Sequence, residues 1–253
     1  MIAPAALDSY PTPEVAALYR PRGAGAWELT VTPLVMCPGY WGAARLVENM
    51  AALQKDGDVW MSLAPLEIES QVIAVAAASG HVVIMGLGMG WVAAECACRA
   101  EVTAVTVVER DPDVIALHRA LNLFDRLPDD CGGKVRVVQG DAYDWTPDQP
   151  VDLLFADIWL PLIDMADRAA EVRQMQANIG ADRVYFWGQE LEIARQCVAA
   201  GRALDAAGIA ATVRELELPL VGPDLPDYPA RTTAAAKAWM RGRWLPGTEN
   251  PFA

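Results

Sequence analysis

Five short, mostly apolar runs constrain the fold of this chain more than any other feature of its sequence. They cover residues 82–85, 102–108, 135–138, 151–156 and 184–187, and each is followed within two residues by glycine or an acidic residue. Runs this short and this apolar are typical of strands covered on both faces, as in a parallel sheet. The sequence therefore predicts a buried sheet whose strands end at turns rich in glycine and carboxylates.

Helical patterns lie between these runs. Asp111 followed by Pro112 is typical of a helix start, and residues 114–121 repeat apolar positions at helical spacing. Four more elements are expected: a helix that Asp164 caps and Gly180 ends, helices over 191–200 and 232–241, and a last strand within 209–218. This alternation predicts an α/β fold, a Rossmann-like, mostly parallel sheet with helices on both faces.

The region ahead of the first run has a different character. Residues 27–36 have strand chemistry interrupted by Pro33, and Asp56-Gly57 is a hairpin signal. We expect three parts: a small β-rich N-terminal region over 1–65, a Rossmann-like domain over 66–225, and a C-terminal helix and tail over 226–253.

Charge and cysteine usage narrow the function classes. Twenty basic and thirty-three acidic residues give a net charge of −13, which disfavours nucleic-acid binding. The five cysteines fit neither a disulfide framework nor a metal site, and no signal peptide is visible. Residues 71–94 lack charged side chains, but Ser79-Gly80-His81 interrupts them, so no membrane span is expected. These features predict a cytoplasmic protein with reduced thiols. Whether the protein forms a homodimer is left open.

The residues directly after the strands are the ones expected to bind a ligand, because ligands of such sheets lie at the carboxyl ends of the strands. They are the glycine loop Gly86, Gly88 and Gly90, then Glu109, then Asp141 with Ala142, and finally Asp157. A carboxylate at the position of Glu109 can accept hydrogen bonds from both hydroxyls of a ribose. The spacing of the glycines differs from the dinucleotide fingerprint, which disfavours a nicotinamide-dependent dehydrogenase.

Together these motifs resemble the class I S-adenosylmethionine-dependent methyltransferases, and within them the spermidine synthase-like branch, over about residues 55–190. The resemblance implies a bound S-adenosyl-L-methionine. It implies that Glu109 holds the ribose, that Asp141 and Ala142 lie at the adenine, and that Gly86 to Gly90 pass the methionine moiety. Asp157 is then expected either to act on the nucleophile as the catalytic residue or to bind the cofactor.

The residues that bind the substrate in that branch are not matched in this sequence. Leu160 stands where a polyamine synthase carries a second acid, Gln71 falls in a replaced Tyr-His-Glu motif, and Trp60 replaces a glutamine. We therefore expect methyl transfer to a small molecule or peptide, with Trp159, Trp60 and Gln71 on the substrate side. Two alternatives stay open: a polyamine aminopropyltransferase, and a non-catalytic nucleoside-binding partner protein.

Overall fold

The five apolar runs form one parallel sheet in the computed structural model, which describes residues 9–160, 162 and 167–252. Its strands are β5 (Gly80–Met85), β6 (Val102–Glu109), β7 (Val135–Gln139), β8 (Leu153–Ala156) and β9 (Arg183–Phe186). They lie in the order β7-β6-β5-β8-β9, and every pair is parallel. The chain thus builds outward from β5 in one direction, then returns to its other side with β8. The predicted α/β fold class is confirmed.

Alternate residues of the strands pack on opposite faces of this sheet. Val82 and Ile84 of β5 belong to the core shared with the helices α1 (Pro65–Ala77), α2 (Trp91–Ala97) and α3 (Pro112–Leu121). Val83 and Met85 belong to the core shared with α4 (Arg168–Ile179). Helices therefore cover both faces, which is why the central strands are apolar almost throughout and do not alternate with polar residues.

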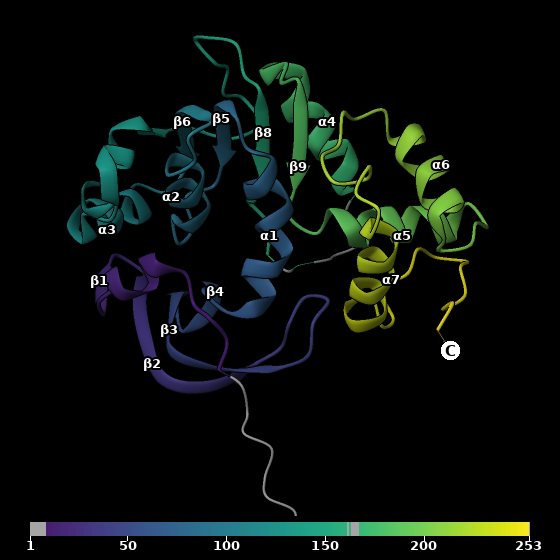
Figure 1. Ribbon diagram of the computed structural model, residues 1–253, viewed down its shortest axis with the longest axis horizontal. Coiled ribbons are helices and arrows are strands. Elements are labelled where there is room, and N and C mark those ends of the chain that lie inside the picture. The colour runs from purple at the N-terminus through teal and green to yellow at the C-terminus, as the bar shows by residue number, and fades with distance from the viewer. Residues whose placement is uncertain (1–8, 161, 163–166, 253) are drawn as a thin grey trace, which may run out of the picture.

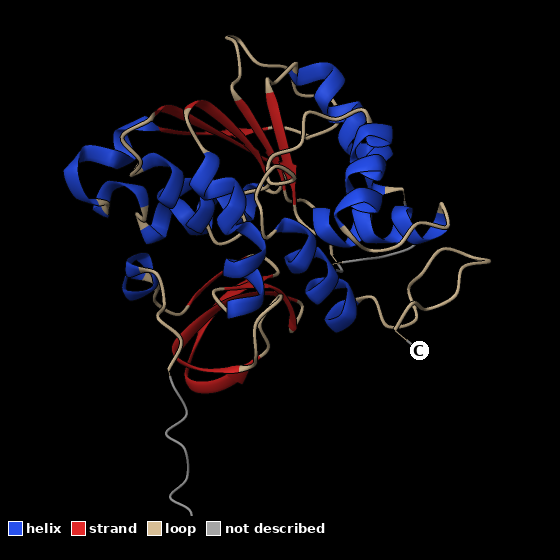
Figure 2. Cartoon of the chain, turned by 45° about the vertical axis from the view of Figure 1, so that its right-hand side comes forward, coloured by secondary structure: helices blue, strands red, loops and turns tan. Residues whose placement is uncertain are grey.

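A second, antiparallel sheet lies ahead of α1. Its strands β1 (Arg22–Ala24), β2 (Trp27–Cys37), β3 (Arg45–Lys55) and β4 (Asp58–Ser62) pair in chain order. Asp56 and Gly57 have φ of 52° and 89°, so the predicted hairpin turn between β3 and β4 is confirmed. In Figure 1 this sheet lies below the parallel sheet, and Figure 2 shows both sheets in red among the helices.

The remaining helices follow β9. They are α5 (Gln189–Ala199), α6 (Ala206–Leu216) and α7 (Tyr228–Trp239), and three short 3-10 segments cover Glu14–Leu18, Phe124–Arg126 and Pro128–Lys134. No helix in the described parts of the chain is both long and apolar enough to span a bilayer.

The predicted strand within residues 209–218 is wrong, because α6 occupies most of that range. Asp205 caps this helix by accepting a hydrogen bond from the backbone N–H of Gly208, and Ile209, Thr212 and Leu216 form its buried face. The extended segment comes later, where Leu220 forms a parallel bridge with Val184 of β9. In a helix, Ile209, Thr212 and Leu216 lie on one face and are buried together, so packing against the core favours the helix over a strand.

Two predicted caps are confirmed, and a third lies outside the described residues. Asp111 accepts a hydrogen bond from the N–H of Asp113 and Pro112 begins α3, as predicted. Gly180 ends α4 in the left-handed conformation, also as predicted. The cap assigned to Asp164 lies outside the described residues, and Asp167 accepts the capping hydrogen bond from the N–H of Ala170.

Candidate functional site

A cleft opens at the carboxyl ends of β5, β6, β7 and β8, and β2, β3 and β4 form its opposite wall. From the parallel sheet it is lined by Gly86, Gly88, Val108, Glu109, Gly140, Asp141, Ala142, Asp157, Ile158 and Trp159; from the antiparallel sheet it is lined by Trp27, Leu53, Lys55, Trp60 and Met61. The structure thus brings most of the predicted site residues to one cleft. Gln71 lines an adjoining chamber, as does Gly90.

The glycine loop after β5 is packed tightly from both sides. Gly86 and Gly88 have φ of 96° and 47°. A Cβ at Gly86 would lie 2.1 Å from the carbonyl oxygen of Asp157, and one at Gly88 would lie 2.2 Å from Sδ of Met61. A side chain is therefore disfavoured at both positions by the positive φ; at Gly86 it would also meet backbone, and at Gly88 it would displace the side chain of Met61. Met61 also accepts a hydrogen bond from the N–H of Met89 through its sulfur, at 3.2 Å.

Glu109 is held against this loop by two backbone donors. Its Oε2 accepts a hydrogen bond from the N–H of Leu87 at 2.9 Å, and its Oε1 accepts one from the N–H of Asp111 at 2.7 Å. Each carboxylate oxygen can accept a second hydrogen bond. A half-buried carboxylate with fixed orientation and spare acceptor capacity therefore borders the cleft.

Asp141 lies at the start of the turn after β7. Its Oδ1 accepts a hydrogen bond from the N–H of Tyr143 at 3.0 Å, which forms an Asx turn. Its Oδ2 lies 3.8 Å from Nη1 of Arg110, whose side chain is 82% exposed, so this ion pair contributes little to stability. Ala142 beside it is buried and packs in the core under α4.

The N-terminal sheet contributes an aromatic wall with one cation. The rings of Trp27 and Trp60 meet edge to face at 5.4 Å. Nζ of Lys55 lies 4.9 Å from the Trp27 ring centroid and 3.9 Å from Oδ2 of Asp111. Asp111 in turn accepts a 2.7 Å hydrogen bond from Nε1 of Trp27. Trp60 is therefore part of a packed cluster at the cleft wall, where a planar or cationic group could contact it.

Asp157 and Gln71 meet directly, although 86 residues separate them. Nε2 of Gln71 donates a 2.8 Å hydrogen bond to Oδ2 of Asp157. Burial raises the pKa of Asp157 to about 7, and the positive charge of Arg168 acts in the opposite direction. The carboxyl group of Asp157 can therefore gain or lose a proton near neutral pH, which suits acid–base chemistry.

Sequence reasoning missed Glu67, which lies one helical turn before Gln71 on α1. Glu67 is buried and lines the same chamber as Gln71 and Asp157. Burial, and then the charge of Asp157, raise the pKa of Glu67 well above its usual range. The available signal was the spacing: Glu67 and Gln71 are four residues apart on a helix whose other buried positions are mostly apolar.

Trp159 is fixed in place by three kinds of contact. Its Nε1 donates a 2.6 Å hydrogen bond to Oε2 of Glu171, which also accepts a 2.5 Å bond from the hydroxyl of Tyr143. Its ring packs edge to face on Phe186 at 6.5 Å, and the guanidinium of Arg168 lies 4.8 Å from its centroid. Trp159 thus presents a rigid aromatic face to the cleft.

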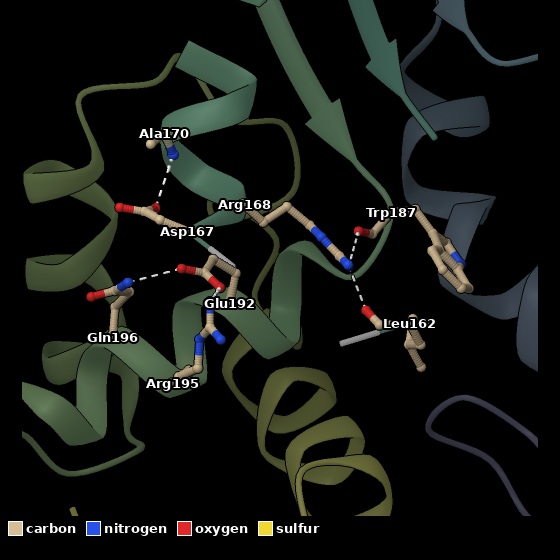
Figure 3. Close-up of polar contacts among 8 residues, drawn as sticks. All are labelled: Leu162, Asp167, Arg168, Ala170, Trp187, Glu192, Arg195 and Gln196. Atoms are coloured by element: carbon tan, nitrogen blue, oxygen red, sulfur yellow. Dashed lines mark hydrogen bonds and ion pairs between the residues drawn. The ribbon is translucent and has the colours of Figure 1, made fainter. Parts of the chain in front are cut away.

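Arg168 is buried behind this tryptophan at the start of α4. Its Nη1 donates to the carbonyl oxygen of Leu162 at 2.5 Å and to that of Trp187 at 3.5 Å, as Figure 3 shows. The same view shows the buried ion pair of Glu192 and Arg195 on α5, 2.5 Å apart. The buried guanidinium of Arg168 therefore binds two backbone carbonyls, one in the loop after β8 and one at the end of β9.

The sequence matches no protein-family model and no curated protein sequence. Solved structures with partial similarity include the glycopeptide N-methyltransferase MtfA complexed with S-adenosyl-L-homocysteine, at 22% identity and TM-score 0.35, covering 44% of this chain and 43% of that one. They also include a DhpI-SAM-HEP complex (21%, TM-score 0.32, 44% and 48%) and the methyltransferase domain of bacterial CtHen1 (15%, TM-score 0.31, 42% and 54%). The similarity thus spans less than half of this chain and roughly half of each of the others.

Proposed function

We propose that the chain binds S-adenosyl-L-methionine in this cleft and transfers its methyl group to a small molecule or peptide. One observation carries the proposal most: the N–H of Leu87, within the glycine loop, donates to Oε2 of Glu109. This contact places a carboxylate and a glycine-rich loop together beside the point where strand order reverses. That is where open α/β sheets bind nucleosides.

Each strand end has a distinct role in this proposal. Glu109 accepts hydrogen bonds from the ribose hydroxyls, and Asp141 with Ala142 borders the adenine. Gly86 and Gly88 allow the methionine moiety to approach the backbone. When bound, the cofactor supplies a methyl group on a positively charged sulfur. Trp27 and Trp60 of the N-terminal sheet line the same cleft, and aromatic faces attract such a positive charge.

Asp157 serves the acceptor in the proposed reaction. Because its pKa is raised to about 7, its carboxylate can take the proton that an amine or hydroxyl nucleophile must lose on methylation. The amide of Gln71 holds Oδ2, whereas Oδ1 accepts no hydrogen bond from the described residues and is the oxygen that takes that proton. Trp159, held by Glu171, borders the acceptor on the other side.

Aminopropyl transfer from the decarboxylated cofactor is the second candidate, and Glu67 favours it. A polyamine acceptor needs acidic groups for its ammonium ends, and Leu160 offers none at the expected position. Glu67 supplies a second carboxyl beside Asp157 from a different element. Turnover of labelled S-adenosyl-L-methionine or of its decarboxylated form, each with a panel of amines and peptides, distinguishes the two reactions.

Calorimetric titration with S-adenosyl-L-homocysteine tests the shared part of the proposal. Glu109→Ala should weaken binding at least tenfold, since a hydrogen bond to a charged group contributes ~1.5–3 kcal/mol. Glu101→Ala, an exposed carboxylate at the opposite end of β6, is the matched control and should bind like the wild type. Equal affinities for the wild type and Glu109→Ala, or tighter binding of NAD, would overturn the nucleoside assignment.

A further inference from the structure

Two acidic side chains share one small chamber that adjoins the cleft. Glu67 and Asp157 both line it, together with Gln71, Met61, Gly86 and Trp91. No lysine, arginine or histidine lines this chamber in the described part of the chain. The chamber and the cleft share Met61, Gly86 and Asp157, so a ligand in the cleft can extend into it.

The hydrogen-bond donors in this chamber do not satisfy both acids. Gln71 donates its amide to Oδ2 of Asp157 at 2.8 Å. Glu67 is 8% exposed, and its Oε2 has no hydrogen-bond partner among the described residues. A buried carboxyl oxygen without a donor is costly, and native proteins seldom retain one without a ligand or functional reason. The missing partner is a hydrogen-bond donor, and the two acids favour a positive one.

The size of the chamber limits what that donor can be. Its free volume is about 20 Å³, which suffices for one water-sized group. A primary ammonium group is that small and has three N–H donors, whereas a guanidinium or a sulfonium with its substituents is larger. The neighbouring Met61 and Trp91 are apolar or aromatic and tolerate the carbon attached to such a group.

We propose that Glu67 and Asp157 together bind one primary ammonium group, with Oε2 of Glu67 and a carboxylate oxygen of Asp157 accepting its N–H donors. Which molecule carries that ammonium rests on the proposed function. It is either the amino-acid end of the adenosyl cofactor or an amine acceptor bound beside it. Both sources have the same chemistry at the nitrogen, and binding breaks no covalent bond.

Three probes distinguish the two sources by calorimetry. S-adenosyl-L-homocysteine carries the nucleoside and an ammonium, 5′-methylthioadenosine carries the nucleoside alone, and 1,4-diaminobutane carries ammonium groups alone. Each is titrated into the wild type, Glu67→Gln and Glu95→Gln. Glu95 is a half-buried carboxyl on α2 that does not line the chamber, so Glu95→Gln is the matched control. Circular dichroism verifies that each variant is folded.

A cofactor ammonium predicts that Glu67→Gln weakens S-adenosyl-L-homocysteine at least tenfold and leaves 5′-methylthioadenosine within twofold. An acceptor ammonium predicts the same loss for 1,4-diaminobutane, with both nucleosides unchanged. In either outcome the wild type should release protons on binding at pH 6.5, measured in two buffers of different ionisation enthalpy, and Glu67→Gln should release fewer. A purely structural Glu67 would not alter that proton count.

The outcomes also separate this site from the proposed function. If the wild type binds no adenosyl compound but binds 1,4-diaminobutane in a Glu67-dependent way, the cofactor assignment fails and the ammonium site stands. If the nucleosides bind and Glu67→Gln leaves all three affinities within twofold, the ammonium site is overturned and the cofactor assignment stands. Binding of none of the three probes would overturn both.

Discussion

The side-chain amide of Gln71 donates a 2.8 Å hydrogen bond to Oδ2 of Asp157 and so joins α1 to the loop after β8. Like the hydrogen bonds from Trp27 to Asp111 and from Met89 to Met61, this contact directly links the segment ahead of the parallel sheet to the carboxyl ends of its strands. It leaves one oxygen of a carboxyl group with a raised pKa available to the cleft.

Gln71→Leu should raise the pKa of Asp157 further. The wild-type amide donates a hydrogen bond that stabilises the charged carboxylate, and the leucine removes it. The expected rise is about one unit, since a hydrogen bond to a charged group contributes ~1.5 kcal/mol or more. It is measured by NMR titration of the carboxyl carbon of Asp157, or as an upward displacement of the acid limb of the pH–rate profile. Gln54→Leu on β3 removes a half-buried amide elsewhere and should leave the titration unchanged. An unaltered Asp157 titration in Gln71→Leu would contradict the role of the amide.

Gly88→Ala should destabilise the protein by about 1–3 kcal/mol, because it places a side chain at a positive φ. The added methyl would also meet Sδ of Met61, so the loop or Met61 must move. Urea denaturation provides the measurement. Gly133→Ala is the matched control, since a Cβ there meets nothing within 4 Å, and it should change stability by less than ~0.5 kcal/mol. Equal stability of the two variants would show that the loop is not tightly packed.

Asp157→Asn should gain stability relative to the wild type as the pH rises from 5 to 8. The folded-state pKa of Asp157 is raised from 3.8 to about 7, so its favourable contribution is complete at low pH and is lost as the pH rises through 7. Glu67 has a raised pKa and acts in the same direction, whereas Arg168 opposes the shift of Asp157. Urea denaturation at pH 5, 6, 7 and 8 should show the difference between variant and wild type growing by about 1–3 kcal/mol. Parallel pH dependences would contradict the raised pKa.

Glu171→Leu should destabilise the loop after β8 more than Glu171→Gln. The leucine leaves Nε1 of Trp159 and the hydroxyl of Tyr143 without their acceptor, at a cost of about 1–3 kcal/mol. The glutamine retains an acceptor oxygen and should cost less than ~1 kcal/mol. Urea denaturation compares the two variants at the same position. If Glu171→Leu loses less than ~0.5 kcal/mol, the carboxylate of Glu171 is not what holds Trp159.

Sequence pattern was sufficient for the parallel sheet and for its strand ends. Strands buried on both faces must be apolar throughout, and a tight turn after β5 must carry glycine at positive φ, so both are visible in a single chain. Asp111 and Gly180 were predictable for the same reason, because a helix cap depends on residues within one turn of it. The failure over residues 209–218 shows the limit of local pattern. There the β-branched residues of α6 favour a strand, whereas the Asp205 cap and the helical spacing of Ile209 and Leu216 favour a helix, and packing of that face on the core decides between them.

By itself, the sequence determined which residues follow each strand, and therefore that glycines and carboxylates gather at one edge of the sheet. Only the tertiary structure decided what each of those residues meets. In the sequence, little distinguishes Glu67 from other acids on helices. Its proposed role comes from the packing of α1 against the loop that carries Asp157, 90 positions later in the chain. The aromatic wall of Trp27 and Trp60, with Lys55 beside it, likewise forms only because the antiparallel sheet covers the cleft. The ends of strands depend on the local pattern of apolar residues, which the sequence shows directly. Contacts between residues far apart in the chain depend on how whole helices and sheets pack, and a local pattern does not show them.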